Sequence, residues 1–162
     1  MSEDEAALPE ENVWDYPRPP RLERVPWEVV VRFGGLDIAR SIQAHRVLET
    51  SHPPTYYVPR SDIRMDLLVP GTGRSFCEFK GRASYWSLRV DGRESLNAAW
   101  SYQDPTAAYA DIAEDLSFYA HKVDDCAVGG IHVLAQEGTF YGGWITPNLK
   151  GPFKGGPGTL GW

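Results

Sequence analysis

Apolar and polar side chains alternate over several short segments of this chain, a spacing typical of strands with one buried face. Three pairs of such segments flank a Gly-Gly or Asp-Gly step: 27–33 and 37–41 around Gly34-Gly35, 84–90 and 94–102 around Asp91-Gly92, and 126–128 and 131–134 around Gly129-Gly130. Glycine adopts the left-handed backbone of tight hairpin turns without steric cost. The pattern therefore predicts three antiparallel hairpins.

Four further segments carry strand-like patterns: 46–50, 56–58, 63–69 and 76–80. The first two lie on either side of Pro53-Pro54, which predicts a corner between them. Gly71-Thr72-Gly73-Arg74 lies between the last two and is followed by no helical pattern, so we expect a turn from strand to strand there.

One segment has helical spacing. Asp104 is a favourable N-cap, and Pro105 suits the first position of a helix. Apolar residues then recur three or four positions apart, at Ala108, Ile112, Leu116 and Tyr119. This spacing predicts one amphipathic helix near residues 105–120, and the chain as a whole is expected to have a mainly β (α+β) fold with antiparallel strands.

The start of the chain differs from the rest. Residues 1–12 are acidic and carry few large apolar side chains, which predicts a disordered tail. Residues 13–162 are then expected to form a single domain, long enough to bury a hydrophobic core. Prolines in 13–26 exclude a helix, so this stretch is expected to be an extended arm that Trp14 and Tyr16 fasten to the body. A proline-rich ligand for another protein is the alternative interpretation of the arm.

Charge and hydropathy exclude several classes of protein. The 16 Lys and Arg residues against 22 Asp and Glu residues give a net charge of −6, whereas binding to nucleic acid or to an anionic membrane needs a basic surface. No stretch approaches the ~20 apolar residues of a membrane-spanning helix, and the acidic N-terminus has no apolar leader segment. We therefore expect a cytoplasmic protein that binds neither nucleic acid nor membrane.

The familiar motifs of cofactor and metal binding are missing from the sequence. No Gly-x-Gly-x-x-Gly opens a strand–helix unit, and neither the phosphate-binding Gly-x-x-x-x-Gly-Lys pattern nor Gly-x-Ser-x-Gly occurs. Cys77 and Cys126 cannot supply a four-cysteine zinc site, and the four histidines lack metal-ligand spacing. We expect no cofactor and no metal site.

Candidate chemistry gathers around the Pro53-Pro54 corner. His52 directly precedes the two prolines, and Glu49 lies three residues earlier. A rigid corner can hold an imidazole in one orientation, as proton transfer or ligand binding requires. The alternative is that Glu49 and His52 only hydrogen-bond the corner together.

A lysine among aromatic residues is the second candidate. Lys80 precedes Tyr85 and Trp86 closely in the sequence, and we predict that its side chain is mostly buried and paired with an acidic group such as Glu49. The alternative is an aliphatic stem covering apolar surface with its ammonium in water. Trp100 and Tyr102 share one face of their strand by two-residue alternation, so they are either core or pocket wall.

These stretches occur in the order found in one known family. The chain resembles the family catalogued as domain of unknown function 427 over roughly residues 12–162, in its segments 14–20, 49–57, 80–86, 100–102, 140–146 and 151–159. The resemblance implies a β-tent-like fold, in which two antiparallel sheets meet at an angle around a pocket. Several β-tent proteins hold zinc through cysteines, which two cysteines cannot do. The family is sometimes labelled a nucleotidyltransferase, but no Gly-Ser followed by Asp-x-Asp is present to hold metal ions.

The leading hypothesis is a domain that binds a small molecule in an aromatic-lined pocket. The predicted ligand-binding residues are Glu49, His52, Tyr56, Tyr57, Lys80, Tyr85, Trp86 and Tyr102. One alternative is a metal-independent enzyme that uses Glu49 and His52 as an acid–base pair. Another is a structural or interaction module that forms a homodimer through its aromatic residues or an exposed strand edge.

Overall fold

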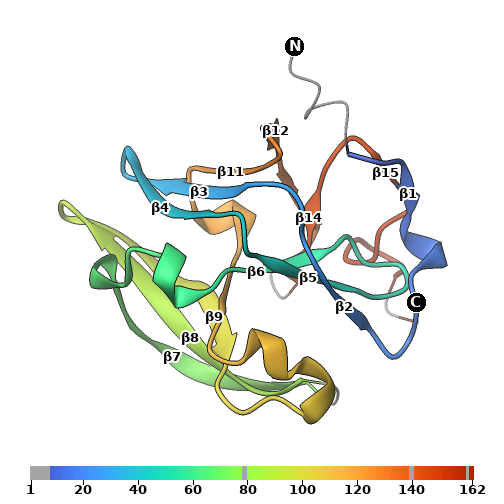
Figure 1. The fold of residues 1–162 in the computed structure, drawn as a ribbon, viewed down its shortest axis with the longest axis horizontal. Coiled ribbons are helices and arrows are strands. Elements are labelled where there is room, and N and C mark those ends of the chain that lie inside the picture. Colours follow the sequence, from blue (N-terminus) through green and yellow to red (C-terminus); the bar gives the residue numbers. More distant parts are fainter. Residues whose placement is uncertain (1–7, 78–79, 139–140, 160) are drawn as a thin grey trace.

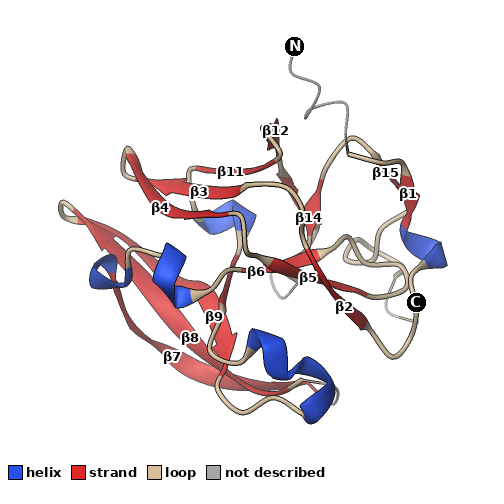
Figure 2. Cartoon of the chain, viewed as in Figure 1, coloured by secondary structure: helices blue, strands red, loops and turns tan. Residues whose placement is uncertain are grey.

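Strands make up 47 % of the chain in the computed structural model, and most of them pair antiparallel (Figures 1 and 2). The structure describes residues 8–77, 80–138, 141–159 and 161–162. One four-stranded sheet has the order β12-β11-β3-β4 and consists of Ile131–His132, Asp125–Val128, Val29–Phe33 and Leu36–Ser41. The other has the order β10-β9-β8-β7 and consists of Leu116–Phe118, Arg93–Tyr102, Gly81–Val90 and Leu68–Cys77. The mainly β fold predicted from the sequence is confirmed.

Three smaller units complete the fold. A three-stranded sheet has the order β2 (Arg21–Arg24), β5 (His45–Leu48) and β6 (Thr55–Tyr57). Two strand pairs join distant segments: β1 (Glu11–Asn12) with β15 (Leu149–Lys150), and β13 (Leu134–Ala135) with β14 (Trp144–Ile145). The helical turns are all short 3₁₀ segments: Val13–Asp15, Arg60–Asp62, Met65–Leu67, Ala107–Ile112 and Ala120–Lys122. Within the described part of the chain, no helix has the length and hydropathy to cross a membrane.

The three predicted hairpins are confirmed. β8 and β9 meet at Asp91-Gly92, whose φ angles of 47° and 79° lie in the left-handed region that a tight hairpin turn requires. Gly34-Gly35 joins β3 to β4 and Gly129-Gly130 joins β11 to β12 with positive φ angles as well. Local turn chemistry thus determines these strand pairs.

The main hydrophobic core contains the inner faces of both four-stranded sheets. Val31 on β3, Leu88 on β8 and Phe118 on β10 are fully buried members of one cluster. The short sheet β2-β5-β6 is joined to the second sheet because Val58 and Leu116 exchange two backbone hydrogen bonds, of 2.8 and 2.9 Å. This junction brings β6 close to β9, where the Tyr57 ring contacts the Trp100 ring.

The predicted helix near 105–120 is wrong. Residues 107–112 form a 3₁₀ segment, and Glu114 adopts a φ of 65°, which no right-handed helix can include. Leu116–Phe118 then form β10, all three residues are buried, and they pair with Ser101, Trp100 and Ala99 of β9. Burial on a sheet edge therefore overrides the helical spacing of Ile112 and Leu116.

Two other expectations need correction. Gly71–Arg74 is not a turn between strands but an irregularity inside one strand, β7, whose register with β8 shifts between Pro70 and Arg74. The predicted strand 76–80 contributes its first two residues to β7, and its residues 78–79 lie outside the described residues. The register shift explains why a glycine-rich stretch occurs within a ten-residue strand.

The N-terminal arm is fastened to the body as predicted. Tyr16 is buried and donates a hydrogen bond to Glu11, while Trp14 Nε1 donates to the carbonyl of Pro152 at 2.8 Å. Glu11 and Asn12, the last two residues of the predicted tail, form β1 and pair with β15. Residues 1–7 of that predicted tail lie outside the described residues.

Candidate functional site

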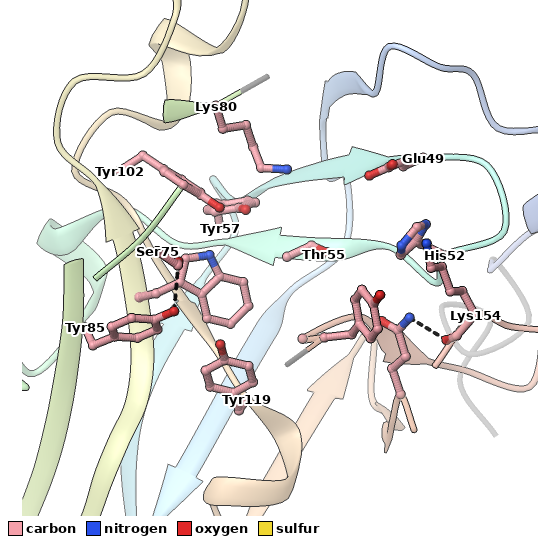
Figure 3. Close-up of a pocket in the computed structure, with 14 residues that line it drawn as sticks. Glu49, His52, Thr55, Tyr57, Ser75, Lys80, Tyr85, Tyr102, Tyr119 and Lys154 are labelled. Carbon is pink, nitrogen blue, oxygen red and sulfur yellow. Dashed lines mark hydrogen bonds between the residues drawn. The ribbon is translucent and has the colours of Figure 1, made fainter. Parts of the chain in front are cut away.

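A cavity of about 280 Å³ lies between the corner joining β5 to β6, the ends of β7, β8 and β9, and the C-terminal segment (Figure 3). It is lined by Glu49, His52, Thr55, Tyr57, Ser75, Lys80, Tyr85, Trp100, Tyr102, Tyr119, Gln136, Tyr141, Gly142 and Lys154. Figure 3 shows the tyrosines of the sheet on one side and Glu49, His52 and Lys154 on the other. The ammonium group of Lys80 extends into the space between the two sides.

Strand register places the aromatic wall. Tyr85 on β8 is directly opposite Trp100 on β9, and Tyr102 lies two residues further along, so the three side chains share one face of the sheet. The Tyr85 hydroxyl donates to Ser75 Oγ at 2.8 Å, which ties β8 to β7 at the rim. The sequence pattern had correctly placed Trp100 and Tyr102 on a common face.

The rings of this wall contact one another closely. The Trp100 ring lies 4.5 Å from that of Tyr119 and 6.3 Å from that of Tyr57, measured between centroids. Tyr57 and Tyr102 are also 6.3 Å apart. All four side chains are at least nine-tenths buried. Such spacing is typical of offset and edge-to-face aromatic pairs, so the wall is a rigid apolar surface.

His52 has a defined orientation. Its Nδ1 lies 2.9 Å from the carbonyl oxygen of Thr50, and because a carbonyl can only accept, Nδ1 carries the proton. Nε2 is then the unprotonated nitrogen of the neutral ring. Burial lowers the pKa of His52 below its usual value, against the opposing effects of Glu49 and the Thr50 carbonyl. The ring also makes an edge contact with Tyr141, at 5.6 Å between centroids.

Glu49 is held on the same corner by different partners. Its Oε2 lies 3.6 Å from Nε of Arg18 in the N-terminal arm, and its carbonyl accepts the backbone N–H of His52 at 3.0 Å. No hydrogen bond or ion pair joins the side chains of Glu49 and His52, both of which the structure describes. The corner is thus held together through the backbone, while both side chains line the cavity.

Lys80 is buried, as predicted, with an exposed fraction of 9 %. Its Nζ lies 5.8 Å from the centroid of the Tyr102 ring, a cation–π distance. The predicted acidic partner is not found: among the described acidic residues none forms an ion pair with Lys80, and Glu49 is paired with Arg18 instead. Glu49 does not pair with Lys80 because Arg18, in the N-terminal arm, supplies its cation.

The remaining wall comes from the C-terminal segments. Gln136 is buried; its Nε2 donates to the carbonyl of Lys154 at 2.6 Å, and its Oε1 accepts from the backbone N–H of Gly143 at 3.0 Å. The Lys154 ammonium donates to the backbone oxygen of Trp162 at 3.1 Å. These hydrogen bonds join the segments around residues 136, 143 and 154 into one side of the cavity.

Six of the eight side chains predicted to bind a ligand line this cavity: Glu49, His52, Tyr57, Lys80, Tyr85 and Tyr102. The other two, Tyr56 and Trp86, do not, because each is adjacent to a lining tyrosine on its strand and therefore faces the opposite way. Tyr56 stacks on Trp144 in the core at 5.0 Å, and Trp86 lies under the guanidinium of Arg60 at 4.9 Å. Ligand binding by the six remains a prediction.

Sequence reasoning missed several lining residues, among them Thr55, Ser75, Gln136, Tyr141 and Lys154. A signal existed for Thr55, Tyr141 and Lys154, since they lie in the family-like stretches 49–57, 140–146 and 151–159. Phe140 of the second stretch lies outside the described residues. Gln136 had no such signal, because its role depends on two segments that come together only in the folded chain.

Metal-ligating residue types and a thiol are present among the side chains that the structure describes. Among the described residues, no cluster of three or more His, Cys, Asp or Glu side chains has an arrangement that would hold a metal ion. Cys126 is buried between β3 and β12, and burial raises the pKa of its thiol. A thiol in that environment is a core residue, not a nucleophile.

Comparison with known proteins places the chain in a family. No curated protein matches the chain. A family model described as "Domain of unknown function (DUF427)" matches residues 21–129, which include both four-stranded sheets up to β11 and the cavity residues from Glu49 to Tyr119. This match covers more than half of the chain, and it confirms the family resemblance found in the sequence segments. The protein belongs to the DUF427 family.

Proposed function

We propose that this domain binds a small molecule in the cavity between β9 and the β5–β6 corner. The observation that supports the proposal is the composition of the wall, in which five tyrosines and one tryptophan surround a few polar groups. Ligand sites usually combine a large apolar surface with a small number of fixed polar groups that orient the ligand. At about 280 Å³ the cavity lies just below the usual range of ligand pockets, so the ligand is a compact metabolite.

The polar groups support the same proposal because they have fixed orientations. Nδ1 of His52 is occupied by the Thr50 carbonyl, which leaves Nε2 as an acceptor, and Lys80 offers three donors on the other side. A molecule with a flat apolar part and a polar end would fit a wall in which aromatic rings lie on one side and these polar groups lie near them.

Two variants on neighbouring positions of β8 test the proposal. Tyr85 lines the cavity, whereas Trp86 points to the opposite face of the sheet, and both side chains are half-buried. The protein is purified from its native host, co-purifying small molecules are identified by mass spectrometry, and these and a broad metabolite library are screened by thermal shift. Tyr85→Ala should abolish the shift that a ligand produces, and Trp86→Ala should retain it relative to its own melting temperature. A library without any stabilising compound, together with no co-purifying molecule, would contradict the proposal.

An enzyme that uses Glu49 and His52 is a second candidate, because both side chains line the cavity and His52 has an unprotonated Nε2. A neutral imidazole of this kind is a general base, and Glu49 would supply the second proton-transfer group. The test is whether a bound compound is converted. His52→Gln should then stop conversion and leave binding intact, whereas unchanged conversion would exclude His52 as the base.

Self-association is a further prediction. β7 is an edge strand of its sheet and carries Pro70 beside a register shift, features that disfavour pairing with a second chain. A homodimer would therefore use another surface, and sedimentation that shows only monomer at micromolar concentration would contradict it.

A further inference from the structure

The ammonium group of Lys80 is the one charged group of the cavity wall, within the described part of the chain, that has neither an ion-pair nor a hydrogen-bond partner. The side chain is nine-tenths buried, and Figure 3 shows its Nζ directed into the space between the tyrosines and Glu49. The ammonium lies over the face of Tyr102, 5.8 Å from Nζ to the ring centroid.

The other ions of the wall already have partners. Glu49 is 3.6 Å from Arg18, and the Lys154 ammonium donates to the backbone oxygen of Trp162 at 3.1 Å. His52 is neutral near pH 7, because burial lowers its pKa. Of the two lysines in the wall, Lys154 thus has a hydrogen-bond acceptor, whereas for the Lys80 ammonium no described residue supplies either a hydrogen bond or a counter-charge.

A charge in such a position is unfavourable unless a partner joins it. Transferring an ammonium from water to a largely enclosed site has a high desolvation cost, and a single cation–π contact offsets only a small part of that cost. An anion that binds next to the Lys80 ammonium would offset this desolvation cost, and its affinity would be higher for that reason.

On these grounds, and resting on the proposed function, we infer that the ligand is a small monoanion whose carboxylate binds to Lys80 while its apolar, planar part lies against Tyr57, Tyr102 and Trp100. One unpartnered ammonium matches one negative charge. A phosphate group is largely dianionic near pH 7, and its second charge would find the other ammonium of the wall, that of Lys154, already hydrogen-bonded to the Trp162 oxygen. The rigid aromatic wall next to Lys80 favours a ring over a flexible chain, because two flat surfaces make extensive contact with little loss of entropy.

Pairs of charged and neutral probes of the same shape separate the effect of the ligand's negative charge from its fit to the cavity. Benzoate and phenylacetate carry the carboxylate, benzamide and phenylacetamide are their neutral counterparts of the same shape, and inorganic phosphate is the dianionic probe. Affinities are measured by calorimetric or NMR titration on the wild-type chain and on Lys80→Met. Lys150→Met is the control, since Lys150 is exposed and pairs with Glu10 on the surface.

Carboxylates should bind the wild-type protein roughly tenfold or more tightly than the amides, the range expected for a hydrogen bond to a charged group. Lys80→Met should remove this preference and leave amide binding unchanged, while Lys150→Met should behave as wild type. If Lys80→Met does not fold, the carboxylate–amide comparison on the wild-type protein decides the question.

Four results would overturn the inference. They are equal binding of amides and carboxylates, unchanged carboxylate affinity in folded Lys80→Met, tighter binding of phosphate than of any carboxylate, and absence of saturable carboxylate binding. The proposed function is tested independently: saturable binding of any probe that Tyr85→Ala abolishes would support the cavity as a ligand site even where the anion inference fails.

Discussion

Replacing Gly142 with alanine should deform the cavity wall through Trp100. A Cβ at this position would lie 2.1 Å from Cη2 and 2.6 Å from Cζ3 of the indole, whereas ordinary contacts begin at 3.4 Å. The difference between 2.1 and 3.4 Å means that the ring or the loop must move by about 1.3 Å. The indole has little freedom to do so, because Tyr119 lies 4.5 Å from it and Tyr57 lies 6.3 Å from it.

The expected cost is that of overpacking a buried site, about 1–3 kcal/mol in the free energy of unfolding. Chemical denaturation of Gly142→Ala against wild type measures it. Gly161→Ala is the matched control: a Cβ there meets nothing within 4 Å and the residue has no positive φ, so its effect should stay within about 0.5 kcal/mol.

A double-mutant cycle with Trp100→Phe identifies the cause. Phenylalanine lacks the ring atoms that the new Cβ would strike, so Gly142→Ala should cost clearly less in that background than in wild type. An equal cost in both backgrounds, or a single variant as stable as Gly161→Ala, would refute the steric argument.

Three further predictions concern the arm and the core. Arg46→Met should lower the free energy of unfolding by about 2–4 kcal/mol in denaturant titrations, because the buried guanidinium pairs with Glu11 and with Glu23, which is 33 % exposed and so partly screened. Burial raises the pKa of Glu11, but hydrogen bonds from Arg46 and Tyr16 outweigh it and hold that pKa below the ordinary 4.5. The ionised Glu11 carboxylate therefore stabilises the fold fully above pH 4.5, and this contribution is lost as the pH falls through the folded-state pKa. Glu11→Gln should flatten the acid side of a plot of unfolding free energy against pH. An unchanged plot would contradict the assignment. In a Cys77→Ser background, Cys126 should react with a thiol reagent only after denaturant is added, and rapid reaction of the native protein would show that the thiol is accessible.

Local chemistry in the sequence determined the hairpins and one face of the site. The backbone conformations of Asp91-Gly92 and Gly34-Gly35 are properties of those residues alone, so the strands on either side could be paired before any tertiary contact was known. Two-residue alternation likewise placed Trp100 and Tyr102 together, and applied to Tyr56 and Tyr57 it would have shown that only one of them can face the cavity.

Only the tertiary structure decided the rest, because the energies involved come from contacts between distant segments. Leu116–Phe118 become a strand since pairing with β9 buries three residues at once, a gain that local helical spacing does not reveal. Glu49 pairs with Arg18 of the N-terminal arm, and Gln136 joins segments around residues 143 and 154. Lys80 is therefore buried beside Tyr102 with no ion-pair partner among the acidic residues that the structure describes, a result of how the folded chain distributes its ions.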